Sequence, residues 1–254
     1  MAETRIDGRN PESLRPITFE RGISRYAEGS VLVKSGNTHV LCTASVEEKV
    51  PPFMRGQGRG WITAEYSMLP RATLQRSPRD ISRLKQNARS SEIQRLIGRS
   101  LRAAVTLEKL GERTVTIDCD VLQADGGTRT ASISGGFIAL YEALRWLKKE
   151  ERLTAIPLKN QIAAISVGKV ENSLLLDLCY EEDSAAEVDA NLVMTGRGDF
   201  IELQGTGEGG SFSCSELAQI IDLGWDGIAK IMRQQREVLE LTPEEEALFK
   251  KCSD

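Results

Sequence analysis

Histidine is almost missing from the 254 residues, because His39 is the only one. A metal site built from several histidines is therefore excluded, and a histidine-assisted nucleophile would have to use His39 itself. Cysteine is sparse and scattered, with no Cys-x-x-Cys pair, which argues against both a disulfide framework and a zinc site. The five cysteines are Cys42, Cys119, Cys179, Cys214 and Cys252. We expect them to be reduced and mostly to fill the core.

Long hydrophobic runs are also missing. No apolar stretch approaches the length of a membrane span, and the first residues, Met-Ala-Glu-Thr-Arg, contain no apolar run of the kind that a secretory signal needs. We therefore expect a cytoplasmic protein with no membrane partner. Apolar residues make up 40% of the chain, which is enough to bury a substantial core in a chain of this length.

Positively charged residues are fewer than negatively charged ones overall, but they are concentrated in one stretch. The net charge is −4, yet residues 55–104 contain ten arginines and Lys85 against three acidic residues, which gives this stretch +8 and leaves −12 for the rest. Binding to a polyanion depends on lysine and arginine that displace its condensed counterions. The asymmetry predicts a basic footprint on one face, of the kind found in nucleic-acid-binding proteins.

Part of this basic stretch has the composition of a loop. Its arginines alternate with glycine, glutamine, serine and proline rather than with an apolar period, which is typical of a segment that follows an RNA backbone. They include Arg55, Arg59, Arg71, Arg76, Arg79 and Arg83. Trp61, Tyr66 and Met68 are candidates for base stacking. The alternative for the aromatic residues Trp61 and Tyr66 is packing within a strand, which is the better explanation for Trp61. The alternative for the arginines is an ordinary solvated surface.

The pattern along the chain is typical of an α+β protein. Three hairpins are predicted, in 30–42, 162–178 and 191–203, and three helices, over 91–110, 131–149 and from Ser213, where Glu216 completes a capping box. The order predicts two halves of similar size that meet near residues 150–160. We divide the chain into 1–150, 151–240 and an acidic tail, 241–254, in which Glu244, Glu245 and Glu246 indicate a solvated, frayed helix end.

The most informative stretch lies between residues 114 and 134. A half-buried strand over 114–121 is followed by Gly126-Gly127, then by Thr128 and Arg129, and a helix begins at once. Backbone N–H groups at a helix N-terminus, a hydroxyl and a guanidinium together make an anion site. The alternative is a tight strand-to-helix turn with an exposed arginine.

Two further groups of charged residues fit an anion site. Arg89 precedes the other amphipathic helix, so two arginines at two helix starts can hold one phosphate; alone, Arg89 is better explained as a solvated loop residue. Asp177, Asp183 and Asp189 follow a strand end, where carboxylates can converge on a hard cation such as Mg²⁺ or serve as a general acid. Without an anion site, a solvated acidic loop would be the simpler explanation.

Three motifs in the chain are specific to one family. They are Gly60-Trp-Ile-Thr-Ala-Glu-Tyr66 with Met68-Leu-Pro-Arg71, Glu92-Ile-Gln-Arg-Leu-Ile-Gly-Arg99, and Val121-Leu-Gln-Ala-Asp-Gly-Gly-Thr-Arg-Thr-Ala-Ser132. Asp183-Ser-Ala-Ala-Glu187, Asp189 and Gln204-Gly-Thr206 complete the set. With these motifs the chain resembles the ribonuclease PH family of bacterial phosphorolytic exoribonucleases, which trim transfer RNA precursors, over about residues 7–239.

The resemblance implies a fold and an assembly. It implies two related βαβα-type halves with mixed sheets packed against helices, a fold like that of ribosomal protein S5 domain 2, and a homohexamer built as a trimer of dimers. It also implies a phosphate-dependent 3′ exoribonuclease, reversible as a nucleotidyltransferase, that acts on transfer RNA precursors and other RNA.

The resemblance also assigns roles to residues. It implies phosphate binding by Arg89, Gly127, Thr128 and Arg129, a metal and acid role for Asp183 and Asp189, and an RNA grip by Arg71, Arg76 and Arg79. Catalysis would then depend on Asp183, Asp189, Arg89 and Arg129. Mg²⁺ and inorganic phosphate are the implied cofactor and co-substrate.

Two rival functions are compatible with the same residues. A hydrolytic nuclease would use the carboxylates to hold two metal ions and would release nucleoside monophosphates. A non-catalytic ring subunit would bind RNA for a partner, but such a subunit should lack the arginine pair or the carboxylates, and this chain has both.

Overall fold

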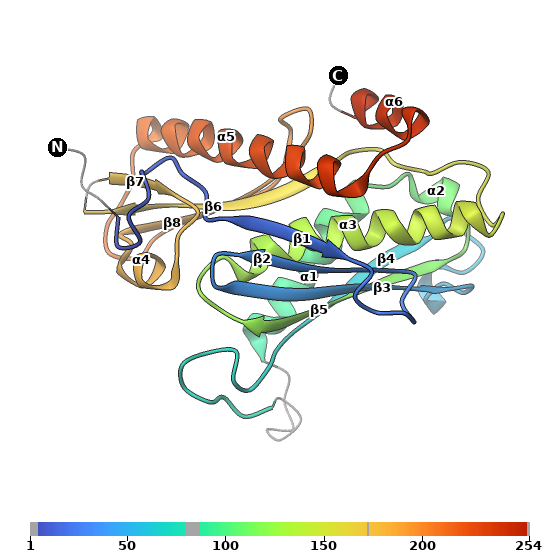
Figure 1. Ribbon diagram of the computed structural model, residues 1–254, viewed down its shortest axis with the longest axis horizontal. Helices are drawn as coiled ribbons and strands as arrows, with labels where there is room; N and C mark the ends of the chain where they lie inside the picture. Colours follow the sequence, from blue (N-terminus) through green and yellow to red (C-terminus); the bar gives the residue numbers. More distant parts are fainter. Residues whose placement is uncertain (1–4, 80–86, 172, 253–254) are drawn as a thin grey trace.

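Two β-sheets with helices packed against them make up the fold (Figure 1). The computed structural model describes residues 5–79, 87–171 and 173–252. The strands are β1 (Ile17–Arg21), β2 (Gly29–Ser35), β3 (Thr38–Glu47), β4 (Trp61–Met68), β5 (Thr114–Gln123), β6 (Ile162–Val170), β7 (Ser173–Leu176), β8 (Val188–Thr195) and β9 (Phe200–Gly207). The helices are η1 (Pro52–Met54), α1 (Ala88–Ala103), α2 (Leu107–Leu110), α3 (Thr128–Lys149), α4 (Tyr180–Ala185), α5 (Cys214–Leu239) and α6 (Pro243–Lys251).

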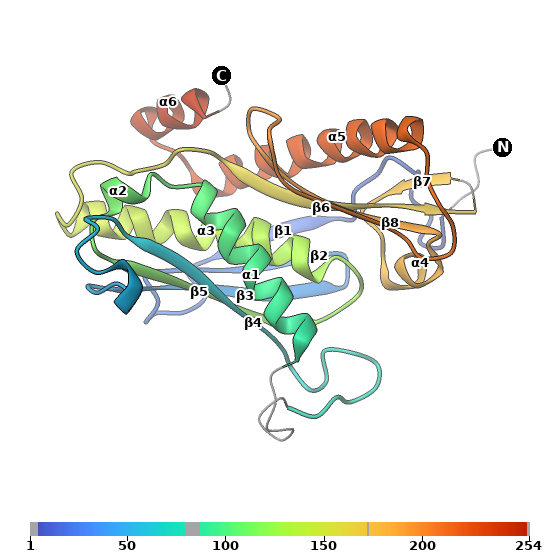
Figure 2. The same ribbon diagram turned by 180° about the vertical axis from the view of Figure 1, so that it is seen from behind.

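The first sheet has the order β1-β2-β3-β5-β4. Its neighbours pair antiparallel except β4 and β5, which are parallel. Apolar and polar residues alternate along β3 and β5, so one face of the sheet is buried. Helices α1 and α3 pack on it, and α1 lies over β4, as Figure 2 shows from behind.

The second sheet has the order β7-β6-β8-β9 and is antiparallel throughout. Helix α5 packs along β6 and also contacts β1 of the first sheet, whereas α3 contacts β2 and β3 as well as β6. Helix α3 is buried along most of its length, because it lies between elements of the two sheets. Elements of both halves therefore meet around its N-terminal end, where Thr128 begins the helix.

The predicted α+β class with mixed sheets and packed helices is confirmed. The capping box also begins α5, with Ser213 as its N-cap. The helix predicted over 91–110 is wrong in its extent, because α1 ends at Ala103 and a separate short helix, α2, begins at Leu107. Backbone groups of residues 104–106 form hydrogen bonds with residues 157–160 instead, so the helix does not continue through this segment. The division into 1–150, 151–240 and 241–254 stays a prediction.

The acidic tail differs from the prediction of a solvated, frayed end. Its helix α6 begins with a capping box at Thr242, and Phe249 is fully buried against Phe137 and Tyr141. Arg145 in α3 donates to both carboxylate oxygens of Glu245, at 2.7 and 2.9 Å. The tail is therefore docked on α3 by an aromatic cluster and a charged fork. None of the helices in the described ranges is long and apolar enough to cross a membrane.

Candidate functional site

Helix α3 begins in a loop that leaves its first N–H groups available. Gly126 and Gly127 have φ angles of +72° and +63°, and a Cβ at Gly126 would lie 2.5 Å from the carbonyl oxygen of Leu178, so only glycine fits. Gly127 is the N-cap and offers no side-chain acceptor to the helix. By contrast, the side chain of Asn87 caps α1 by accepting from the backbone N–H of Arg89. The start of α3 is therefore suited to an external anion.

Two arginines and two carboxylates predicted from the sequence lie in one pocket. The cavity has a volume of about 270 Å³ and is formed by the starts of α1 and α3 together with α4 and β8. Its lining residues are Met68, Thr73, Arg89, Ala124, Gly126, Gly127, Thr128, Arg129, Ser166, Tyr180, Asp183, Asp189 and Asn191. The pocket thus combines elements from both halves of the chain.

Contacts from neighbouring strands orient the two side chains that begin α3. The hydroxyls of Thr128 and Tyr66 are 2.8 Å apart. Arg129 donates from Nη1 to Oε1 of Gln204 in β9, at 2.9 Å. Tyr66 is only 4% exposed, so of the two interpretations base stacking is wrong and packing within the strand is confirmed. Its ring belongs to the core and its hydroxyl contacts that of Thr128.

The two aspartates have environments that oppose ionisation. Burial raises the pKa of Asp183, although the nearby Arg129 and Arg89 act to lower it. Burial and the neighbouring Asp183 raise the pKa of Asp189 to about 6, although Arg129 and an Asn191 amide 3.2 Å away favour its charged form. At a given pH the pair therefore holds a proton more readily than surface aspartates do.

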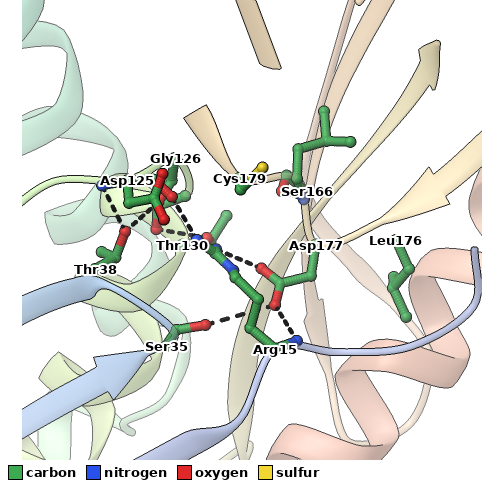
Figure 3. Close-up of polar contacts among 12 residues, drawn as sticks. Arg15, Ser35, Thr38, Asp125, Gly126, Thr130, Ser166, Leu176, Asp177 and Cys179 are labelled. Carbon is green, nitrogen blue, oxygen red and sulfur yellow. Dashed lines mark hydrogen bonds and ion pairs between the residues drawn. The ribbon is translucent and has the colours of Figure 1, made fainter. Parts of the chain in front are cut away.

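Asp177 does not line this pocket, so the predicted convergence of three aspartates is wrong. It is 2% exposed and accepts from Nη2 of Arg15 at 2.6 Å and from the backbone N–H of Arg15 at 2.8 Å (Figure 3). Sequence reasoning missed Arg15, since its partner is 162 residues away and no local pattern connects them.

The arginines predicted to bind RNA fall into two groups. Arg71, Arg76 and Arg79 are exposed on the segment that follows β4. The N–H of Ala124, two residues before Gly126, donates to the carbonyl of Ala72 in that segment. Arg83 lies outside the described residues.

Arg55 and Arg59 precede β4, whereas Met68 at the far end of that strand lines the pocket. An eight-residue strand spans roughly 25 Å, so this chain does not bring them to its own pocket. Trp61 packs against Phe53 and Arg102, as expected of a strand residue.

Comparisons with known proteins agree with this geometry. Residues 13–145 match domain 1 of the 3′ exoribonuclease family, and residues 160–227 match domain 2. The chain belongs to the 3′ exoribonuclease family. A protein named ribonuclease PH from Synechococcus sp. (strain JA-3-3Ab) is 58% identical over 95% of this chain and all of its own length. Another of that name, from strain JA-2-3B'a(2-13), is 57% identical over 95% of this chain and 99% of its own.

Solved structures of more distant proteins share the fold. Rice Rrp46 matches with a TM-score of 0.76 at 22% identity, covering 92% of this chain and all of that one. The Archaeoglobus fulgidus exosome with RNA bound to the active site gives 0.76 at 23% identity, covering 91% and 92%. Through its family this chain is a phosphorolytic 3′-5′ exoribonuclease, and an enzyme of that kind is a nucleotidyltransferase.

Proposed function

We propose that phosphorolysis takes place in the 270 Å³ pocket, with inorganic phosphate held by Arg89, Arg129 and the start of α3. The observation that carries this proposal is that both arginines, the Gly127-Thr128 pair and both aspartates line one cavity. The helix dipole, the uncapped N–H groups and two guanidinium groups all favour a doubly charged anion at this point. A phosphate held there is already oriented for attack, which lowers the entropic barrier to reaction.

The proposed reaction needs no protein nucleophile. An oxygen of the bound phosphate attacks the last phosphodiester, the bond from phosphorus to the ribose 3′ oxygen breaks, and a nucleoside diphosphate leaves. The departing 3′ oxygen takes a proton, for which we assign Asp183 as the donor, because burial raises the pKa of its carboxyl. Asp189 beside it shares this role of holding a proton in the pocket.

In the proposed site Asp183 and Asp189 would also supply two of the ligands of Mg²⁺. The described residues contain no group of three or more His, Cys, Asp or Glu side chains that could hold a metal ion. Mg²⁺, however, commonly takes one or two protein carboxylates and completes its shell with water and substrate phosphate. The effect of Asp183 on the pKa of Asp189 is a repulsion that a cation would relieve. When bound, Mg²⁺ would offset the charge of two anions that otherwise repel each other.

The proposed substrate is the 3′ end of RNA, in particular of transfer RNA precursors, and the proposed assembly is a homohexamer, a trimer of dimers. The segment that follows β4 carries the exposed Arg71, Arg76 and Arg79. Their guanidinium groups would contact successive phosphates of the RNA backbone. Arg55 and Arg59 lie at the far end of β4 from the pocket, so their proposed RNA contacts are most useful to RNA that enters from another copy in a ring. We also propose that the enzyme works in the cytoplasm.

An assay of products with and without inorganic phosphate tests the proposal. Degradation should stop without phosphate, every released nucleotide should be a diphosphate, and RNA tails should grow when diphosphates are abundant and phosphate is scarce. Asp183→Asn should abolish both directions, because one transition state serves both. Monophosphate products, or full activity in phosphate-free buffer with Mg²⁺, would favour a hydrolytic nuclease. Binding of RNA with neither product would indicate a non-catalytic subunit.

A further inference from the structure

The N-terminal segment, residues 5–15, contributes three arginines that contact residues next to the pocket-lining ones. Arg5 and Arg15 are 6% and 4% exposed, although arginine is among the residues least often buried. Their partners are two carboxylates on the other half of the chain, Asp177 and Glu182, each 2% exposed. Burying several charges in this way is costly unless each is paired and hydrogen-bonded, so the cluster requires defined geometry.

Arg15 connects the two walls of the pocket. Its Nη2 donates to Oδ1 of Asp177 at 2.6 Å, and its Nη1 donates to the backbone carbonyl of Asp125, immediately before Gly126 (Figure 3). The Arg15 guanidinium also lies against the Gly126-Gly127 loop, which we call the phosphate loop. A Cβ added to Gly127 would be only 2.9 Å from Nη2 of Arg15. One guanidinium thus contacts the first half at the loop and the second half at Asp177.

The same loop is tied to α4 from its other side. The backbone N–H of Tyr180, the first residue of α4, donates to Oδ1 of Asp125 at 3.1 Å. Thr38 donates to the carbonyl of Gly126 at 2.6 Å and accepts from the N–H of Asp125 at 2.9 Å. The loop is therefore held at its carbonyls, its N–H and its side chain.

Arg5 and Arg9 fix the residue next to Asp183. Arg5 donates from Nε and Nη2 to the two carboxylate oxygens of Glu182, at 2.7 and 2.5 Å, and Arg9 approaches the same carboxylate at 3.6 Å. Glu182 also accepts from the N–H of Cys179, which caps α4. Since Glu182 and Asp183 are successive residues of one short helix, holding Glu182 restricts where Asp183 can lie.

We propose that Arg15, together with Asp177, is a positioning pair for phosphorolysis that fixes the phosphate loop at Gly126-Gly127 against the segment carrying Asp183. This inference rests on the proposed phosphate site. The pair touches no reacting atom; it acts through the loop and through α4. Its removal should displace the N–H donors of α3 relative to Asp183, so that phosphate binds less well and in poorer alignment with the proton donor.

Kinetics of Asp177→Asn and Arg15→Lys test this role. Asparagine keeps the size of Asp177 without its charge, and lysine keeps the charge of Arg15 but lacks the fork that reaches Asp177 and the Asp125 carbonyl together. Both variants should raise the KM for inorganic phosphate about tenfold or more, because small misplacements at a reacting site have effects of this size. Affinity for single-stranded RNA, measured without phosphate, should stay within about twofold of wild type, because the arginines after β4 are untouched.

A matched control separates positioning from an effect on stability. Glu245→Gln disrupts the Arg145–Glu245 fork, which ties α6 to α3, and Glu245 is 7% exposed. It should lower Tm and leave the KM for phosphate unchanged. If Asp177→Asn and Arg15→Lys lower Tm but keep the wild-type KM, as the control does, the pair is merely structural and the inference is overturned.

Arg89→Ala in the same series distinguishes this inference from the proposed function. If Arg89→Ala raises the KM for phosphate and the pair variants do not, the positioning role alone is wrong. If neither raises it, the phosphate site itself is misplaced, and the inference fails with it.

Discussion

Replacing Asp189 by asparagine should make the protein more stable at neutral pH while it impairs catalysis. Burial and Asp183 raise the pKa of Asp189 from 3.8 to about 6. Between these two values the folded state binds more protons than the unfolded state, so stability falls as pH rises through this window. Above pH 6 the full penalty is present, and below about pH 4 it is absent.

The size of the effect follows from the shift. A displacement of about two pKa units corresponds to about 3 kcal/mol between the two protonation states. Asp189 keeps some contact with solvent, so we expect about 1–2 kcal/mol. Asparagine resembles the protonated acid in size and charge, and its oxygen can still accept from the Asn191 amide, which is 3.2 Å from the present carboxylate.

Urea unfolding of wild type and Asp189→Asn at pH 4, 5, 6, 7 and 8, with a chelator and without phosphate, measures the effect. The variant's advantage should be near zero at pH 4, grow to pH 6 and then level off. Asp222→Asn, on the exposed face of α5, is the control and should show no such growth. The reasoning is refuted if Asp189→Asn is no more stable than wild type at pH 8, or if its advantage does not change with pH.

Other consequences of the structure can be measured directly. Arg129→Ala should raise the KM for phosphate by about one to two decades, because a charge-assisted hydrogen bond is worth about 1.5–3 kcal/mol; an unchanged KM would remove Arg129 from the phosphate site. Replacing Arg71, Arg76 and Arg79 together by alanine should flatten the salt dependence of RNA binding by about 0.7 for each RNA phosphate that these arginines neutralise. An unchanged slope would show that these arginines do not bind RNA and are ordinary solvated surface residues. Phe249→Ala should destabilise the protein by about 3–5 kcal/mol in denaturant unfolding, whereas a frayed tail would give no change. Light scattering should detect a hexamer, and a monomer at all working concentrations would contradict the proposed ring.

Local signals made part of the fold predictable from the sequence. The Ser213-Glu216 capping box marks the start of α5. Gly126-Gly127 marks the strand-to-helix turn, because positive φ angles favour glycine whatever the rest of the chain does. A helix start, a hydroxyl and an arginine are also adjacent in sequence, which is why the sequence could point to Thr128 and Arg129, and the structure places both in one pocket. That this pocket binds an anion stays a prediction.

What the sequence could not predict depends on distant pairing. Asp177 lies in the same acidic stretch as Asp183 and Asp189. Only the fold places Arg15 beside Asp177 and removes Asp177 from the pocket. The break after α1 arises because residues 157–160 pair with the backbone there, which overrides a helical period that continues to Leu110. The docking of α6 was hidden because Phe249 follows a run of glutamates whose charge suggests solvent.

The two kinds of carboxylate in this region have opposite effects on stability, and the arrangement connects them. Asp183 and Asp189 are partly buried near each other in the pocket where we propose that phosphorolysis takes place, and their raised pKa values mean that folding opposes their charge. Glu182, next to Asp183, is paired with Arg5. Although burial acts to raise the pKa of Glu182, the contact with Arg5 helps to lower it below its ordinary value. Above the pKa that Glu182 has in the unfolded chain, its ionised carboxylate therefore stabilises the folded state. In the same pH range the ionised pocket aspartates destabilise the folded state. In the positioning role proposed above, Arg5, Arg9 and Arg15 hold Asp177 and Glu182, which both precede Asp183 in the chain, and so restrict where Asp183 can lie relative to Asp189. A variant that loosens this cluster should let Asp183 and Asp189 move apart, so the pKa of Asp189 should fall toward its ordinary value. Titration of Asp189 by NMR in Asp177→Asn would detect that fall, and an unchanged titration would show that the neighbouring segment is held by other contacts.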